Sequence, residues 1–144
     1  MGEECGRYWI HCRRHRGAVA RILVMDDDGT LRGAIRVALE AAGYEVLEAA
    51  DGRAGLRLQR EQGADLVLVD IFMPERDGLE VIRALRAEQA KPTIVAMSGG
   101  GRTGQIEVLE AAAALGASRT LVKPFEPRQL LKVIRELLGE RAAS

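Results

Sequence analysis

The stretch Asp65-Leu66-Val67-Leu68-Val69-Asp70-Ile71-Phe72-Met73-Pro74 decides the fold. Its uninterrupted apolar run, from Leu66 to Val69, is typical of a strand covered on both faces, as in a parallel sheet. Asp70 would then end a central strand, at the edge where open α/β sheets bind ligands. Pro74 lacks an N–H donor and disfavours helix in the residue before it, so a loop should follow. The pattern therefore predicts an exposed aspartate that is supported by a loop.

Similar apolar runs recur along the chain and alternate with helical patterns. Buried strands are predicted at 21–25, 66–69 and 93–98. A more polar strand at 44–48 should lie nearer a sheet edge, and a fifth strand at 119–123 ends in a lysine. Helical spacing of apolar residues follows each strand, at 31–42, 54–61, 78–88, 105–115 and, after a turn at 123–125, up to 138. Five strands that alternate with five helices predict an α/β fold with a doubly wound, five-stranded parallel sheet.

Length and composition limit the possible partners. The 144 residues suit one domain, and 21 basic residues balance 21 acidic ones, so no overall field attracts nucleic acid or an anionic membrane. No apolar stretch approaches the roughly 20 residues of a membrane-spanning helix. The first 20 residues also lack the apolar core of a signal peptide. We therefore expect a cytoplasmic protein that contacts neither membrane nor nucleic acid directly.

Residues 1–19 differ in character from the rest and are interpreted as a poorly ordered N-terminal extension to a domain at 20–140. This segment holds both cysteines, both histidines and the only tryptophan. A zinc site formed by Cys5, His11, Cys12 and His15 is an alternative, although the paired spacing of structural zinc ligands is missing. A basic arm that touches RNA or lipid is another alternative.

Four of the five predicted strands end in polar groups: Asp26 with Asp27, Asp70, Ser98 and Lys123. Taken alone, each could have an ordinary structural role, such as a helix cap or a turn. In a parallel sheet, however, all carboxyl ends lie on one edge, so these side chains should meet in one crevice. Three neighbouring carboxylates repel one another and need a cation, and oxygen ligands suit Mg²⁺. With a lysine and a hydroxyl beside them, they predict a carboxylate nucleophile that faces a phosphoryl group.

From about residue 20 to residue 138, the chain resembles the receiver domains of two-component response regulators. The motifs that carry the resemblance are Ile22-Leu23-Val24-Met25-Asp26-Asp27-Asp28, Leu68-Val69-Asp70-Ile71-Phe72-Met73-Pro74 with Asp77-Gly78, Ala96-Met97-Ser98 and Val122-Lys123-Pro124-Phe125. The resemblance implies a flavodoxin-like sheet with strand order 2-1-3-4-5. It also implies that Asp70 accepts a phosphoryl group from a phosphohistidine of a sensor kinase, with Mg²⁺ required, to form an aspartyl phosphate.

The resemblance assigns a role to each residue of the site. Asp26 and Asp27 would be the acidic pair that holds Mg²⁺, with Asp27 the more direct ligand, and Asp70 and the backbone carbonyl of Phe72 would complete the protein ligands. Ser98 would contact the phosphoryl group through its hydroxyl, and Lys123 would be the counter-ion.

One position departs from the family pattern, because Thr120 stands where receivers commonly have a switching Tyr or Phe. We expect phosphorylation to alter the face formed by the helix at 105–115, the strand at 119–123 and the last helix without an aromatic rotamer change. Amide chemical shifts recorded with and without beryllofluoride test this expectation. Shifts that stay fixed over 99–123 would refute it.

Two rival functions are less consistent with the residues. A Mg²⁺-dependent phosphohydrolase would need a general acid near its nucleophile, and the position two residues after Asp70 is Phe72. A flavodoxin-like cofactor binder would need a hydroxyl-rich phosphate loop after the first strand, where Asp26-Asp27-Asp28 would repel phosphate. We therefore expect a signalling domain that assists its own phosphorylation and dephosphorylation, and not an enzyme of either class.

The sequence also predicts the arrangement and partners of this domain. No DNA-binding or catalytic pattern follows the last helix, which favours a stand-alone receiver. Its expected partners are a sensor histidine kinase or a histidine phosphotransfer protein, and a downstream protein target. Docking onto that target and relay of the phosphoryl group to another histidine remain equal alternatives.

Deleting residues 1–18 should leave both folding and phosphorylation unchanged, because an untethered terminus contributes little to a folded core. Thermal melting of the full and shortened chains measures this directly. A large fall in melting temperature on truncation would contradict the interpretation of this segment as a poorly ordered extension.

Overall fold

The computed structural model describes residues 19–73, 78–89, 91–99 and 105–139. The predictions for the N-terminal segment, including a zinc site, concern residues 1–18 and lie outside the described residues. The loop predicted at Pro74 and residues 100–104 lie outside them as well.

The described strands form one parallel sheet: β1 (Arg21–Met25), β2 (Glu45–Ala49), β3 (Leu66–Asp70), β4 (Thr93–Gly99) and β5 (Arg119–Lys123). They lie side by side in the order β2-β1-β3-β4-β5, and each neighbouring pair is parallel. The predicted doubly wound sheet and its strand order are confirmed. The strand that was predicted to be more polar and nearer an edge, β2, does lie at an edge of the sheet.

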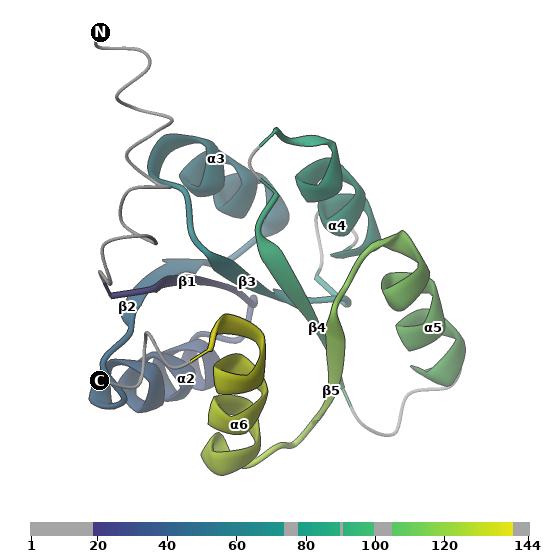
Figure 1. Ribbon diagram of the computed structural model, residues 1–144. Helices are drawn as coiled ribbons and strands as arrows, with labels where there is room; N and C mark the ends of the chain where they lie inside the picture. Colours follow the sequence, from purple (N-terminus) through teal and green to yellow (C-terminus); the bar gives the residue numbers. More distant parts are fainter. Residues whose placement is uncertain (1–18, 74–77, 90, 100–104, 140–144) are drawn as a thin grey trace, which may run out of the picture.

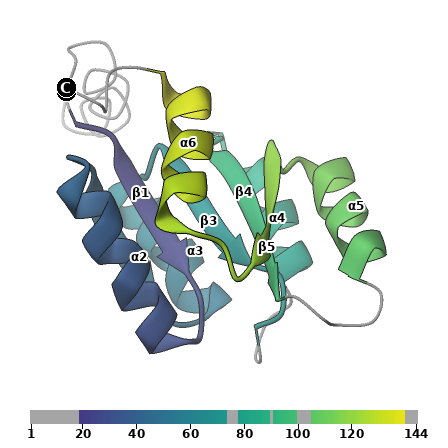
Figure 2. The same ribbon diagram turned by 90° about the horizontal axis from the view of Figure 1, so that it is seen from below.

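Helices cover both faces of the sheet (Figures 1 and 2). On one face lie α2 (Gly29–Ala41) and α6 (Pro127–Leu138), and on the other lie α3 (Gly52–Gln62), α4 (Gly78–Ala87) and α5 (Gln105–Leu115). None of the described helices is long and apolar enough to cross a lipid bilayer.

Alternate residues of the central strand β3 contribute to two separate cores. Val67 and Val69 are buried beneath the face that carries α3, α4 and α5, whereas Leu66 and Leu68 are buried beneath α2 and α6. Successive side chains of a strand point to opposite faces, so a run of four apolar residues is what a doubly covered strand requires. This packing holds the carboxyl end of β3 in place.

The acidic residues in the turn between β1 and α2 have different structural roles. Asp28 caps α2, since its carboxylate accepts hydrogen bonds from the backbone N–H groups of Thr30 and Leu31 at 3.0 and 3.2 Å. The ordinary role considered for Asp26 or Asp27, that of the helix cap, is therefore wrong. Neither of these two residues caps α2, so their role at the end of β1 is a different one.

The strand register brings the predicted site residues to one edge of the sheet. Asp70 is the residue of β3 opposite Met97 of β4. The next residue of β4, Ser98, pairs with Val122 of β5, and Gly99 pairs with Lys123. The carboxyl ends of β1, β3, β4 and β5 therefore surround one region.

Candidate functional site

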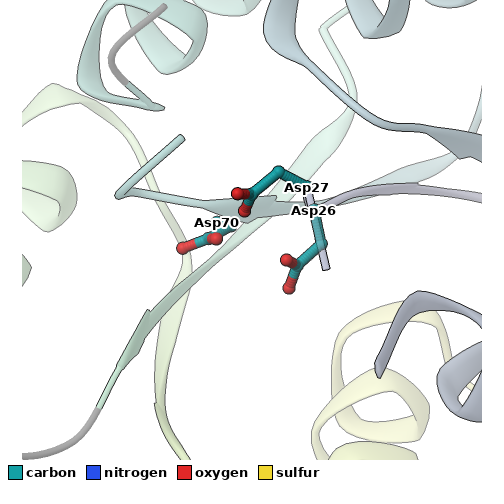
Figure 3. Close-up of side chains that lie close together, drawn as sticks. All are labelled: Asp26, Asp27 and Asp70. Carbon is teal, nitrogen blue, oxygen red and sulfur yellow. The ribbon is translucent and has the colours of Figure 1, made fainter. Parts of the chain in front are cut away.

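Three aspartates gather at this edge of the sheet (Figure 3). Asp26 and Asp27 directly follow β1, and Asp70 is the last residue of β3. One carboxylate oxygen of each lies within 4.8 Å of those of the other two. Asp26 and Asp70 are buried, whereas Asp27 is exposed, so the cluster opens to solvent on the side of Asp27. The predicted convergence of these carboxylates is present.

Asp26 is held on every side. Its Oδ2 accepts a hydrogen bond from Lys123 Nζ at 2.7 Å, and its Oδ1 accepts one from the backbone N–H of Asp28 at 3.0 Å. Its own backbone N–H donates to the carbonyl of Ala49 in β2 at 3.1 Å. These contacts fix both the backbone and the carboxylate of Asp26 at the end of β1.

Asp70 lies deeper than the sequence indicated, since only 4% of its surface is exposed. The prediction of an exposed aspartate is wrong, because the last residue of the central strand is enclosed by the ends of its neighbours. Its Oδ1 accepts a hydrogen bond from the Phe72 backbone N–H at 3.1 Å, and its Oδ2 lies 3.4 Å from Lys123 Nζ. Burial raises the pKa of Asp70 to about 6, against the opposing effect of Lys123 and with a further contribution from the negative charge of Asp26.

Ser98 and Lys123 complete the group. Ser98 is fully buried, and its hydroxyl oxygen has no hydrogen-bond partner among the described residues. Buried hydroxyl groups are normally paired, so an unpaired one near the carboxyl end of β4 is a candidate for contact with a ligand. The Lys123 ammonium spans Asp26 and Asp70 and is mostly buried.

Thr120 is not brought to the aspartates. It is exposed on β5 at the level of Ala96, two residues before the level of Ser98. Phe72 lies just beyond β3, and its backbone N–H contacts Asp70.

The donor set fits a hard divalent cation. The described cluster presents carboxylate oxygens alone, and one exposed and two buried carboxylates close together repel one another unless a positive charge joins them. Lys123 compensates part of that charge. Magnesium prefers one or two carboxylates together with waters and phosphate oxygens, which matches a cluster open to solvent on one side.

The comparisons with known proteins agree with this geometry. The model of the response regulator receiver domain family matches residues 22–135, which span the sheet apart from Arg21 and all but the last turn of α6. This chain belongs to the response regulator receiver domain family.

Solved structures include similar receiver domains from other organisms. This receiver domain superimposes on a CheY-like receiver domain protein from Methanospirillum hungatei with a TM-score of 0.78 at 30% identity, over 86% of this chain and 97% of the other. For chemotaxis protein CheY4 of Vibrio cholerae the TM-score is 0.75 at 32% identity, over 83% and 98% of the two chains.

Among curated proteins, the receiver domain is 35% identical to the transcriptional regulatory protein ResD of Bacillus subtilis over 118 residues, 82% of this chain and 48% of ResD. SrrA of Staphylococcus aureus, also a transcriptional regulatory protein, is 32% identical over 81% of this chain and 47% of SrrA. The chain spans about half the length of these curated relatives.

Two features of the receiver site were not predicted from the sequence. The first is Gly78, the first residue of α4, which closes over the end of β3. Its N–H donates to the Ile71 carbonyl at 3.0 Å, and a Cβ at this position would lie 2.5 Å from both the Asp70 carbonyl oxygen and the Ile71 Cα. The Asp77-Gly78 pair indicated a helix start, but only the fold shows what the helix start rests on.

Replacing Gly78 by alanine should lower the free energy of unfolding by about 1–3 kcal/mol, because the new methyl group would press on the backbone beside Asp70. Urea denaturation measures this change. The matched control is Gly33→Ala in α2, where a Cβ would have no neighbour within 4 Å and alanine should stabilise the helix by about 0.5–1 kcal/mol. Equal effects of the two substitutions would contradict the close contact at Gly78.

The second feature is an arginine on α2, Arg32. Its Nη1 donates to the backbone carbonyl of Asp26 at 2.7 Å, and its Nε pairs with Glu48 at the end of β2. The sequence places Arg32 near the start of the helix that follows the acidic run. That position is the only signal in the sequence, and it does not reveal the partner on β2.

Proposed function

We propose that this receiver domain accepts a phosphoryl group on Asp70 from a phosphohistidine of a sensor histidine kinase or a histidine phosphotransfer protein. The observation that carries the proposal is a buried carboxylate with a raised pKa that shares Lys123 with Asp26, at the open edge of a parallel sheet. Receiver domains are signalling domains that take part in two-component systems with histidine kinases. The roles of the individual residues below are part of the proposal.

Asp70 acts as the nucleophile. One of its carboxylate oxygens forms a bond to phosphorus, the bond from phosphorus to the histidine nitrogen breaks, and that nitrogen keeps the electron pair. The N–H of Phe72 holds Asp70 Oδ1, so Oδ2 on the side of Lys123 is the oxygen with more freedom to react. Attack of water on the phosphorus would return the free carboxylate, which is how the domain would assist its own dephosphorylation.

Lys123 and Ser98 receive the transferred group. Lys123 Nζ already contacts both Asp26 and Asp70. After transfer, the phosphoryl group would replace the Asp70 carboxylate as the second anionic partner of the lysine. The Ser98 hydroxyl has no partner among the described residues and can donate to a phosphoryl oxygen. Thr120 lies away from the aspartates, so we propose that any switching there acts through β5 and not through direct contact.

The cation would be held by Asp26, Asp27, Asp70 and the backbone carbonyl of Phe72, with Asp27 as the most accessible carboxylate. When bound, Mg²⁺ neutralises the negative charge that accumulates between the carboxylates and the phosphoryl oxygens. The chain itself supplies the fixed positions, because β1 and β3 are packed on both faces of the sheet.

Incubation with acetyl phosphate, followed by intact mass spectrometry, tests the proposal. With Mg²⁺ present we expect the mass to rise by one phosphoryl group, and with EDTA in place of Mg²⁺ we expect no change. Equal labelling with and without the cation would refute the metal requirement, and no labelling under either condition would refute phosphoryl acceptance.

The output of the domain is also a proposal. We infer that phosphorylation alters the face formed by α5, β5 and α6, since Ser98 and Lys123 stand at the ends of the strands beside these helices. The receiver unit is proposed to be residues 20–140. Stand-alone action and the lack of a direct nucleic-acid contact stay predictions, because relatives such as ResD and SrrA are named transcriptional regulatory proteins and are about twice as long.

A further inference from the structure

Arg32 links the acidic turn to the far edge strand of the sheet. Its Nη1 donates to the backbone carbonyl oxygen of Asp26 at 2.7 Å, and its Nε donates to Glu48 Oε1 at 2.9 Å. Both side chains of this ion pair are largely covered, with 20% of Arg32 and 25% of Glu48 exposed. An arginine held at two points by its planar guanidinium has little freedom, so the carbonyl that it contacts is also fixed.

The contacted carbonyl belongs to the peptide unit that carries Asp27. A peptide bond is planar, so the orientation of the Asp26 carbonyl also sets the direction of the Asp27 N–H and the starting point of the Asp27 side chain. Asp27 is exposed, and its carboxylate makes no hydrogen bond or ion pair to any residue in the described part of the chain. Its place beside Asp26 and Asp70 (Figure 3) therefore depends on the backbone of this turn.

Glu48 is the fixed point from which Arg32 reaches the turn. It lies on β2 opposite Val24, and Val24 is two residues before Asp26 in β1 and the following turn. Its second oxygen, Oε2, accepts a hydrogen bond from Arg36 Nη1 at 2.7 Å, and the hydrogen bond from Arg36, followed by that from Arg32, lowers its pKa. Within the described residues, Arg36 forms ion pairs with Glu40 and Glu48 and with no aspartate of the acidic turn.

We propose that Arg32, anchored by Glu48, is a positioning residue for the divalent-cation site, because it orients the peptide unit that presents Asp27 to the other two carboxylates. The inference rests on the proposed function, since it concerns the same site. Among the described residues, Arg32 contacts the Asp26 carbonyl and Glu48 and no carboxylate of the cluster, so it would act through the backbone.

The direction in which Mg²⁺ affinity changes when Arg32 is removed distinguishes a positioning role from a purely electrostatic one. Arg32 is a positive charge near three carboxylates, so its removal would strengthen cation binding if charge alone mattered. Loss of a positioning contact would instead weaken binding, because the carboxylates would no longer be held together. The two roles thus predict opposite changes in Mg²⁺ affinity.

Calorimetric titration with MgCl₂ of the wild-type chain, Arg32→Met and Arg36→Met tests the proposal. We expect Arg32→Met to weaken Mg²⁺ binding about tenfold, as is typical when the support of a metal ligand is removed, and Arg36→Met to change it by less than about twofold. Arg36 is the matched control, since it pairs with the same glutamate. Unchanged or tighter binding by Arg32→Met, or equal weakening by Arg36→Met, would overturn the proposal.

Two further variants test the proposal even if Arg32→Met fails to fold. An ammonium group can serve the carbonyl or Glu48 but cannot reproduce the forked contact with both, so Arg32→Lys should bind Mg²⁺ with intermediate affinity. Glu48→Gln replaces the charged acceptor of Arg32 by a neutral and weaker one, so the anchor loosens and Mg²⁺ binding should also weaken. Wild-type affinity in both variants would overturn the proposal.

A measurement without metal keeps this inference separate from the proposed function. The Asp28 N–H donates to Asp26 Oδ1 within the turn, so its hydrogen exchange in metal-free protein should be faster in Arg32→Met than in Arg36→Met. Equal exchange in the two variants would overturn the positioning role. Lack of Mg²⁺ binding by the wild-type chain would instead refute the proposed function and leave the exchange comparison valid.

Discussion

Replacing Asp70 by asparagine should abolish phosphoryl uptake from acetyl phosphate. The amide nitrogen and oxygen of asparagine nearly match the carboxylate in shape, and the Phe72 N–H can still donate to the amide oxygen. The nucleophilic carboxylate is lost, however, so no aspartyl phosphate can form. Intact mass spectrometry in the presence of Mg²⁺ should show no added phosphoryl group.

Asp65→Asn is the matched control for this experiment. Asp65 directly precedes the same strand at its opposite end, where its Oδ2 accepts a hydrogen bond from the Arg21 backbone N–H at 2.8 Å. The Asp65→Asn variant should take up a phosphoryl group as the wild-type chain does. Persistent labelling of Asp70→Asn would show that another residue accepts the phosphoryl group.

The same substitution at Asp70 should stabilise the metal-free protein near neutral pH. The folded pKa of Asp70 is raised to about 6 from an ordinary value of 3.8, so the folded state holds more protons than the unfolded state between these values. Wild-type stability therefore falls as pH rises through this window, by about 3 kcal/mol in total. Asparagine does not titrate, so Asp70→Asn should not lose this stability. Its free energy of unfolding should equal that of the wild-type chain near pH 4 and exceed it by the full amount above pH 6.

Replacing Lys123 by methionine should have the second large effect. The ammonium of Lys123 lies 2.7 Å from Asp26 Oδ2 and 3.4 Å from Asp70 Oδ2, and both carboxylates are buried. Removing the shared cation leaves two buried carboxylates to repel each other, and the loss of a buried ion-pair partner destabilises a protein by about 3–5 kcal/mol. Urea denaturation of metal-free protein at pH 7 should show a loss of this order.

A second substitution identifies the origin of that loss. Asp26→Asn in the Lys123→Met background should recover part of the stability, since it removes one of the two unpaired charges. Lys132→Met on the exposed side of α6 is the control and should change stability by less than about 0.5 kcal/mol. If Lys123→Met were as stable as the control, the lysine would not compensate the buried carboxylates.

The sheet could be predicted from the sequence because its three central strands, β1, β3 and β4, are buried on both faces. In a chain of this length, continuous apolar runs such as Leu66 to Val69, bounded by polar residues and turn signals, indicate buried parallel strands. Once the strands are parallel, their carboxyl ends must share an edge, and this placed Asp26, Asp27, Asp70, Ser98 and Lys123 together without knowledge of any distance.

Burial and side-chain partners could not be predicted in the same way. Asp70 precedes a loop in the sequence, which suggested exposure, but the neighbouring strand ends enclose it in three dimensions. The contact of Arg32 with Asp26 depends on a helical side chain that reaches back to the turn while a residue of another strand holds it. Such contacts follow from the register of β1 with β2, which local sequence patterns do not specify.

Some helix boundaries could be predicted from the local sequence, whereas others depend on side-chain contacts. The helix at 105–115 agrees with its apolar pattern and its glycine stop, since Gly116 has a φ of 128° that favours glycine. The first described helix instead begins at Gly29, two residues before the predicted start, because Asp28 is its cap. Acidic residues suggested a cap near this point, and only the hydrogen bonds decide which one.

The most direct test of the site is a crystal structure of the chain with Mg²⁺ and beryllofluoride, which mimics a phosphoryl group bound to an aspartate. We predict the beryllofluoride on a carboxylate oxygen of Asp70, with Ser98 and Lys123 against its fluorine atoms and the cation on Asp27. Beryllofluoride bound at another residue, or a cation bound away from Asp27 and Asp70, would contradict the account.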